Sequence, residues 1–333
     1  MDRRVGMFVV TLTGALLGAL SAGVSSQQPA GVQSSALPSP IPREPSWAFP
    51  VIGGSLPAES PDPKTIPGST KKYTPKEIDD LTFPPDWLPD AHPPAPEVVQ
   101  KGRPGVLACG SCHLMSGLGH PESADVTGYT AAYVVQQMND FRSGVRPDFA
   151  ARMNGIAKAL TDEEIRQTAE WFASLPRRRW VRVVEADTVP KTFIGQGRMR
   201  FIDPQAKGQM EPIGNRIIML PENEELARWR DPRSGFLAYV PQGSVARGKV
   251  LAETGGNGRT VACVVCHGPG LTGVANVPRL AGVHPIYLVR QLYHFREGTR
   301  KGVDAALMVR TVAQLTDQDI VDLSAYSASL SPE

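Results

Sequence analysis

All four cysteines of this 333-residue chain lie in two pentapeptides of the form Cys-x-x-Cys-His. The first pentapeptide is CGSCH at 109–113, and the second is CVVCH at 263–267. Thiols and an imidazole at this spacing could form a redox-active dithiol, a zinc site or an attachment point for haem. The three alternatives use the histidine differently, and this difference separates them.

A redox dithiol needs no histidine after its second cysteine, and a zinc site built from both cysteine pairs would leave both histidines unused. Covalent haem attachment uses all three residue types, because the two thiols add to the vinyl groups of haem and the histidine binds the iron. The pattern therefore favours haem. The predicted thioether residues are Cys109, Cys112, Cys263 and Cys266, and the predicted proximal ligands are His113 and His267.

A second axial ligand for each iron is expected from a methionine further along the chain. Met153 follows His113 by 40 residues, and Met308 follows His267 by 41 residues. A thioether suits low-spin haem iron, whereas a lone methionine on an apolar helix face is ordinarily core filler. Because the two methionines occupy matched places, we expect both to bind iron.

Other histidines and methionines are rivals for these coordination positions. His120 follows His113 by only seven residues, too few for it to reach the opposite face of the haem. For the remaining rivals we expect surface positions, satisfied hydrogen bonds or core packing. They are His92, His284, His294, Met199, Met210 and Met219.

The two pentapeptides belong to an internal repeat. Residues 109–146 match residues 263–300 in one register, at a constant separation of 154 residues. After one added residue in the second copy, LTDEEI at 160–165 matches LTDQDI at 315–320. A repeat of this kind indicates that one structural unit occurs twice.

Each copy of the repeat has the periodicity of helices. Val134, Met138 and Phe141 recur on one helix face, and the second copy repeats this spacing. The last helix of each copy is predicted to begin with a capping box, in which a threonine precedes an acidic residue by three positions. These pairs are Thr161 with Glu164 and Thr316 with Asp319.

The segments outside the repeat have their own compositions. Residues 1–26 are predicted to be a cleaved export signal, with an uncleaved membrane anchor as the alternative. Residues 27–94 are rich in proline and are predicted to be a tether, extended as far as Pro67, followed by a wrapping segment. Residues 177–242 hold short apolar runs and are predicted to be a β-leaning insert. The fold class is then mainly α, with helical domains at 95–176 and 243–333.

The two copies resemble class I cytochrome c domains, and the whole resembles the tandem dihaem cytochromes c of the cytochrome c-four type. The second copy carries the resemblance in CVVCHG, PRLAG, YLVRQLYHFREGTR and LTDQDIVDLSAY, and the first in CGSCH, YVVQQMNDFRSGVR and LTDEEI. The resemblance covers about residues 95–176 and 243–331. It implies two class I cytochrome c domains in tandem and two covalently attached haem c groups.

The resemblance also implies a proline whose carbonyl group holds the proximal histidine. Pro278 fits this role for His267, whereas the first copy has Ala124 at the matched position. Leu114 stands in the first copy where a glycine usually follows the histidine. We therefore expect the first haem to differ from the second in potential or exposure.

Four arginines follow the central helices at matched places, and two interpretations stay open for them. They either pair with the haem propionates or are solvated cations that suit the helix dipole. The four residues are Arg142, Arg146, Arg296 and Arg300.

The sequence places no acid–base pair or further nucleophile near either motif. With histidine and methionine on each iron, the expected function is transfer of single electrons between periplasmic redox partners, such as a dehydrogenase or an oxidase. The alternatives are a peroxidase-like enzyme with a displaceable ligand at the first haem, and a cytochrome subunit of a larger dehydrogenase complex. The net charge of +2 gives no case for nucleic-acid binding.

Overall fold

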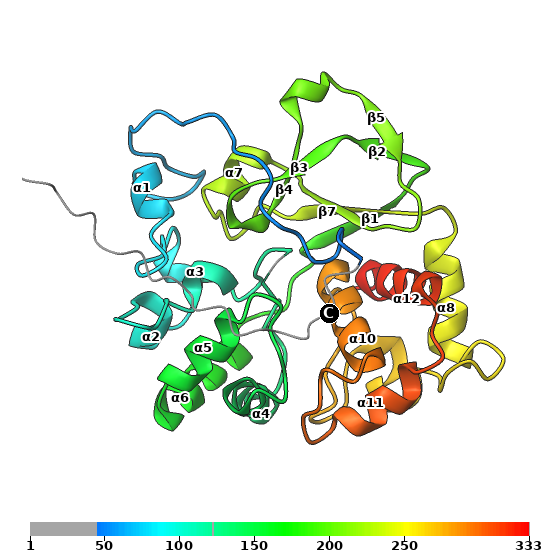
Figure 1. The fold of residues 1–333 in the computed structure, drawn as a ribbon. Helices are drawn as coiled ribbons and strands as arrows, with labels where there is room; N and C mark the ends of the chain where they lie inside the picture. Colours follow the sequence, from blue (N-terminus) through cyan, green and yellow to red (C-terminus); the bar gives the residue numbers. More distant parts are fainter. Residues whose placement is uncertain (1–44, 122, 333) are drawn as a thin grey trace, which may run out of the picture. The chain divides into compact units, whose positions relative to one another are not determined.

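The computed structural model describes residues 45–121 and 123–332. The predicted export signal at 1–26 and the first part of the proline-rich tether lie outside the described residues. Within the described part, helices form both copies of the repeat, and strands occur between the copies (Figure 1). No helix of that part is both long and apolar enough to cross a membrane.

The first copy of the repeat consists of five helices. They are α2 (Glu97–Gln100), α3 (Gly110–His113), α4 (Ala131–Ser143), α5 (Arg152–Ala159) and α6 (Asp162–Ser174). The central helix α4 packs against both α5 and α6. The first pentapeptide consists of α3 and Cys109 at its N-cap, so a single helical turn fixes the spacing of its thiols and imidazole.

The second copy repeats this arrangement. Its helices are α8 (Ser244–Thr254), α9 (Val264–His267), α10 (Pro285–Arg296), α11 (Ala305–Val312) and α12 (Asp317–Ser329). The central helix α10 packs against α11 and α12, and α12 also packs against α8 (Figure 1). The described residues also form the short 3-10 helices η1 (Pro89–Ala91), η2 (Gln196–Arg198), η3 (Pro204–Ala206) and η4 (Pro269–Leu271).

Side-chain caps define where the last helix of each copy begins. Thr161 and Glu164 form a capping box at the start of α6, and Thr316 and Asp319 form one at the start of α12. Both predicted capping boxes are therefore confirmed. Each box satisfies backbone N–H groups that the first helical turn leaves without partners.

The region between the copies contains one three-stranded sheet and two smaller sheets. In the larger sheet, β1 (Val181–Glu185) runs parallel to β7 (Phe236–Val240), and β7 pairs antiparallel with β6 (Ile218–Pro221). The smaller sheets pair β2 (Thr188–Pro190) with β5 (Met210–Pro212), and β3 (Thr192–Ile194) with β4 (Arg200–Ile202). Helix α7 (Glu224–Arg228) follows β6. Alternate side chains of β7 enter the core that α10 and α12 also build.

The segment before the first copy packs against the region between the copies. It contains α1 (Pro75–Ile78), which begins at a capping box. Ile78 and Trp87 are buried in a cluster against Leu226 and Trp229. The indole N–H of Trp87 donates a hydrogen bond to the Trp229 carbonyl oxygen at 2.7 Å.

The structure differs from the prediction of an extended tether over the described residues 45–67. Ala48, Phe49 and Ile66 are all buried there, and the first two belong to the main core. The proline content indicated an extended backbone, but these few apolar side chains supply enough buried surface to hold it in place. The segment is a fixed cover in this region.

The two copies contact each other, and one of the contacts joins matched positions of the repeat. Asp125 and Arg279 are 154 residues apart in the sequence and form a fully buried ion pair. The imidazole Nε2 of His284 in the second copy lies 2.9 Å from the Leu118 carbonyl oxygen in the first. Contact between equivalent positions is what an approximate two-fold relation between the copies produces.

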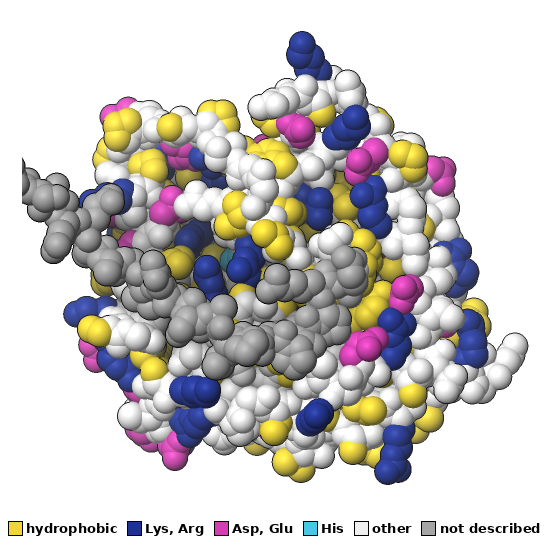
Figure 2. All heavy atoms as spheres, viewed as in Figure 1, with side chains coloured by type: hydrophobic (Ala, Val, Ile, Leu, Met, Phe, Trp, Pro, Cys, Tyr) yellow, Lys and Arg dark blue, Asp and Glu magenta, His cyan; other side chains and the backbone are white. Residues whose placement is uncertain are grey.

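Charged side chains of both signs share the surface. On the face seen in Figure 2, Lys and Arg side chains are spread out, with Asp and Glu side chains among them. This distribution agrees with the 35 basic and 33 acidic residues of the sequence. No large field of one sign covers this face.

Candidate functional site

The first candidate site is a cavity of about 260 Å³ inside the first copy of the repeat. Its wall includes Cys109, Cys112 and His113 of the first pentapeptide, together with Met153 from α5. Apolar side chains of α4 and α6 complete the pocket, among them Phe141. The structure therefore brings the four predicted haem-binding residues of this copy to one space.

The second candidate site is a cavity of about 450 Å³ inside the second copy. Cys263, Cys266 and His267 lie on its wall, and α11 contributes Met308. The two cavities thus present the same set of two thiols, one imidazole and one thioether. The matched methionines reach their cavities from helices of equal length that precede the last helix of each copy.

Each proximal histidine is held by a backbone carbonyl group. His113 Nδ1 lies 2.8 Å from the Ala124 carbonyl oxygen, and His267 Nδ1 lies 2.7 Å from the Pro278 carbonyl oxygen. Since a carbonyl oxygen only accepts, Nδ1 carries the proton and Nε2 keeps the lone pair that a metal would take. Replacement of proline by Ala124 leaves this bond in place, because the bond requires only a backbone oxygen.

Burial keeps both imidazoles neutral. It lowers the pKa of His113, although the Ala124 carbonyl and the carboxylates of Asp125 and Asp148 raise it in part. Burial likewise lowers the pKa of His267 against the opposing effect of the Pro278 carbonyl. A neutral imidazole is the form that binds iron.

The cysteines lack the electrostatics of a redox dithiol. Burial raises the pKa of Cys109 to about 12 and that of Cys263 to about 11, whereas a reactive dithiol needs a lowered thiol pKa. The two cysteine pairs also lie in separate cavities, and the described residues contain no cluster of three or more groups that could hold a metal ion. The geometry therefore fits thioether attachment better than either alternative.

One layer of polar side chains separates the two cavities. Five residues line both of them: Tyr129, Tyr133, Gln137, Tyr287 and Gln291. Tyr133 matches Tyr287 in the repeat, and Gln137 matches Gln291. The sequence shows these matched pairs only as part of the repeat at 109–146 and 263–300. The signal in the sequence is that the same polar residue recurs in both copies at helix positions where the apolar periodicity does not require a polar one.

Two of the four predicted arginines meet in this layer. Arg146 donates to Gln137 at 2.9 Å and to the Tyr287 hydroxyl at 2.8 Å. Arg300 donates to Gln291 at 2.8 Å and to Gln137 at 2.6 Å. Both guanidinium groups are buried without an ion pair among the described residues, so the interpretation as solvated helix-end cations is wrong for them.

The other two arginines brace the turn before the last helix and line neither cavity. Arg142 donates to the Leu160 carbonyl at 2.9 Å and pairs with Asp162 at 2.6 Å. Arg296 repeats this with the Leu315 carbonyl at 3.0 Å and Asp317 at 2.8 Å. Pairing with haem propionates therefore receives no support at these two positions.

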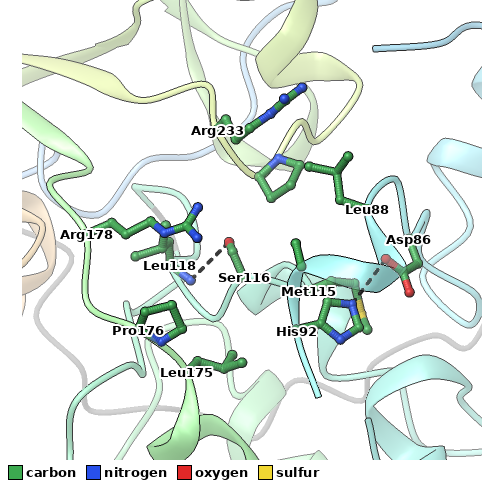
Figure 3. A pocket seen from close by; sticks show the side chains of 12 residues that line it. Asp86, Leu88, His92, Met115, Ser116, Leu118, Leu175, Pro176, Arg178 and Arg233 are labelled. Atoms are coloured by element: carbon green, nitrogen blue, oxygen red, sulfur yellow. Dashed lines mark hydrogen bonds and ion pairs between the residues drawn. The ribbon is translucent and has the colours of Figure 1, made fainter. Parts of the chain in front are cut away.

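The rival histidines fall into three places. His92 lies in a separate cavity of about 40 Å³, with its Nε2 3.2 Å from Asp86 (Figure 3). His284 is buried between the copies and lines neither large cavity. His120 and His294 both line the first cavity, and burial lowers the pKa of His120 to about 3 and that of His294 to about 4.

The methionines of the region between the copies lie away from both large cavities. Met199 and Met219 are buried in the main core, and Met210 is exposed in β5. None of the three lines either cavity. Within the described residues, Met153 therefore has no methionine rival from this region.

The residue after each proximal histidine shows a local difference between the sites. Gly268 has φ 77° and ψ 167°, and Leu114 has φ 60° and ψ 162°. This part of backbone space is freely open only to glycine, so Leu114 is strained where Gly268 is not. The Leu114 side chain is buried in the core, which holds it in this conformation.

Comparison with known proteins places this geometry in a family. The family model for cytochrome c matches residues 245–331. Cytochrome c4 of Pseudomonas aeruginosa is 26% identical over 233 residues, which are 69% of this chain and 87% of that protein. A thiosulfate dehydrogenase electron acceptor of Stutzerimonas stutzeri is 25% identical over 231 residues, 68% of this chain and 81% of that protein.

A shorter relative is more similar in sequence. Cytochrome c-554(548) of Halomonas halodenitrificans is 43% identical over 68 residues, which are 20% of this chain and 82% of that protein. Identity at this level over most of a relative agrees with the match of the family model. The chain therefore belongs to the cytochrome c family, whose members bind haem c covalently.

Proposed function

We propose that this protein is an exported dihaem cytochrome c that passes single electrons between redox partners through two haems with histidine and methionine ligands. The observation that carries the proposal is the recurrence of one donor set in two cavities. Each cavity offers two thiols for attachment, one imidazole nitrogen with a free lone pair, and one thioether. Haem bound in this way supplies one-electron redox chemistry.

The residues of the chain would then have distinct tasks. Cys109 and Cys112 hold the first haem, and the carbonyl of Ala124 fixes the orientation of its proximal ligand, His113. Met153 completes the ligand set from α5. The second site assigns the same tasks to Cys263, Cys266, His267, the Pro278 carbonyl and Met308.

The layer between the cavities supports a relay. Because five residues line both cavities, the two haems would be separated by little more than one layer of side chains. Arg146 and Arg300 place two buried positive charges in this layer, and the Asp140 carboxylate is near both without forming an ion pair with either. Haem propionates are the anions that would balance them.

The second site offers the more exposed route to a partner. Cys266 is exposed, and four valine and leucine side chains on the wall of the second cavity are also exposed. They are Val261, Val274, Val277 and Leu307. An apolar rim around a redox cofactor suits a transient protein contact, so we propose that electrons are exchanged with partners at this site.

The relatives suggest the class of partner and the compartment. One relative is named for its role as electron acceptor of thiosulfate dehydrogenase, so a dehydrogenase is the donor that we propose. An export signal at 1–26 would place the mature protein in the periplasm, where such exchange would occur.

An electron count tests this proposal. Anaerobic reductive titration of the purified holoprotein is expected to consume two electrons per chain, and the reduced protein is expected to return both to an added one-electron acceptor. Turnover of hydrogen peroxide by the same preparation would contradict a pure carrier and favour the peroxidase-like alternative.

A further inference from the structure

Arg230 reaches from the region between the copies to the first haem motif. It follows α7 and lines the first cavity. Its guanidinium group donates a hydrogen bond to the carbonyl oxygen of Ser111, which lies between the two cysteines of CGSCH. This arginine therefore touches the first motif from a segment that is not part of the repeat.

The backbone around Arg230 is held firmly in place. Arg230 itself has φ 59°, a left-handed conformation that is uncommon for a residue with a side chain. The neighbouring Trp229 is fixed from both sides: its carbonyl accepts from Trp87 at 2.7 Å, and its indole N–H donates to Glu59 at 3.1 Å. Arg228 also pairs with Glu59, at 2.6 Å. The position of Arg230 is thus set by the cover formed by residues 45–94.

The positive charge of Arg230 is half-buried at the wall of the first cavity. Within the described residues it forms no ion pair, and the Ser111 carbonyl accepts its single side-chain hydrogen bond. Burial lowers the pKa of Arg230, whereas Cys112, Asp79 and Asp80 raise it slightly. An arginine stays protonated even so, which leaves a full positive charge at this wall of the cavity.

The second site has no such charge at its motif. Val265 occupies the position that matches Ser111, and 71% of it is exposed, against 2% of Ser111. The two arginines that line the second cavity, Arg279 and Arg300, donate instead to residues outside the second motif. The difference between the sites therefore comes from the cover over the first motif.

We infer that Arg230 raises the reduction potential of the haem in the first cavity; the inference rests on the proposed function. Reduction removes one positive charge from the iron, so a fixed cation nearby stabilises the reduced form. Because Ser111 lies between the two cysteines that would hold the haem, Arg230 would place its charge beside the point of attachment.

The test is a spectroscopic redox titration of the Arg230→Gln holoprotein. Glutamine keeps a donor for the Ser111 carbonyl but removes the charge. We expect the reduction potential of one of the two redox transitions to fall by about 59 mV. For one electron this corresponds to a factor of about ten in the equilibrium constant for reduction. The shifted transition should be the one that Met153→Ala also changes.

Controls separate the charge from structural damage. Arg230→Lys keeps the charge, so the reduction potentials of both transitions should change by no more than a small fraction of this shift. Arg216→Gln removes an arginine of the same region that pairs with Glu211 at 3.0 Å, away from the cavity, and should shift neither transition. Arg230→Met gives the same measurement if the glutamine variant does not fold.

Two different failures can be told apart. Two intact transitions that do not move in Arg230→Gln, or that move together, would overturn the role of Arg230 and leave the proposed function standing. A wild-type protein with fewer than two transitions would instead overturn the proposed function.

Discussion

The two haem motifs have the same sequence pattern but opposite surroundings. In the first, Ser111 is buried: its hydroxyl donates to the Leu81 carbonyl at 2.8 Å, and its own carbonyl accepts from Arg230. In the second, the matched Val265 is exposed and Cys266 is exposed beside it. Both copies of the repeat contain the predicted ligands. Segments outside the repeat determine which of the two motifs is exposed to solvent.

The contrast lies outside the predicted ligands, which are the same in both copies. Both copies keep the imidazole–carbonyl bond and the methionine on α5 or α11. What differs is one strained residue, one half-buried arginine after α7, and the cover formed by residues 45–94. The predicted roles are an inner, covered site and an outer, exposed one.

Removal of either predicted sixth ligand, Met153 or Met308, should have the largest effect and should make the two haems differ in ligation. Met153→Ala and Met308→Ala are each expected to convert one of two low-spin haems to a form that binds carbon monoxide, because the iron loses its thioether. Absorption spectra with and without the gas give the measurement. If either variant kept two low-spin haems, its methionine would not be a ligand. Met219→Ala is the control, since Met219 lies in the core away from both cavities.

The ion pair between the copies should have the next largest effect. Arg279→Met leaves the Asp125 carboxylate buried without its partner, which should reduce the free energy of unfolding by about 3–5 kcal/mol. Denaturant unfolding of the holoprotein checks this value. Arg166→Met removes exposed pairs with Glu163 and Glu170 and should change stability by less than about 1 kcal/mol. Equal losses in the two variants would mean that the buried pair does not join the copies.

His284 should make the contact between the copies sensitive to pH. It stands where the first copy has Thr130, and burial lowers its pKa from 6.5 to about 4. A folded pKa below the unfolded one means that the unfolded chain binds the proton more readily. Stability is therefore expected to fall as the pH drops from 6.5 to 4, by about 3 kcal/mol from this group.

Comparison with His284→Gln measures that contribution. Glutamine keeps a donor toward the Leu118 carbonyl but does not titrate, so the variant should lose less stability than the wild type across this pH range. Unfolding curves at several pH values give the difference. Identical pH profiles for the two proteins would show that His284 does not titrate as described.

The residue after the proximal histidine should give the smallest effect and the sharpest contrast. Gly268→Ala forces a side chain into a glycine conformation and places Cβ 2.9 Å from Val274, so it should lose about 1–3 kcal/mol of stability. At the matched position, Leu114→Gly should be at least as stable as Leu114→Ala, because glycine removes the strain. A less stable Leu114→Gly protein would mean that Leu114 is not strained. Thermal unfolding of the four proteins decides this.

The sequence predicted the helical copies and their donor atoms because these depend on local spacing. Three-residue steps in a helix, capping boxes and one repeat register predicted Cys109, His113 and Met153 as one set, and the structure brings the three to one cavity. The hydrogen bond that the Ala124 carbonyl accepts from His113 does not depend on which residue stands at position 124. A backbone carbonyl can accept this bond whether or not the residue is proline.

Features that depend on distant packing could not be predicted. The burial of Phe49 and Ile66 arises from contacts with segments far along the chain, and proline content alone indicated the opposite. Nothing near Arg230 in the sequence points to Ser111, which lies 119 residues away. The Asp125–Arg279 ion pair is an exception, because the sequence itself has opposite charges at matched positions of the repeat.

A haem count combined with the ligand spectrum of each haem in the oxidised holoprotein tests whether both donor sets bind haem iron. We predict two covalently bound haems per chain, each with the near-infrared charge-transfer signature of methionine bound to ferric iron. One signature should disappear in Met153→Ala and the other in Met308→Ala. A single haem per chain, or a second haem without the methionine signature, would contradict the account of two equivalent donor sets.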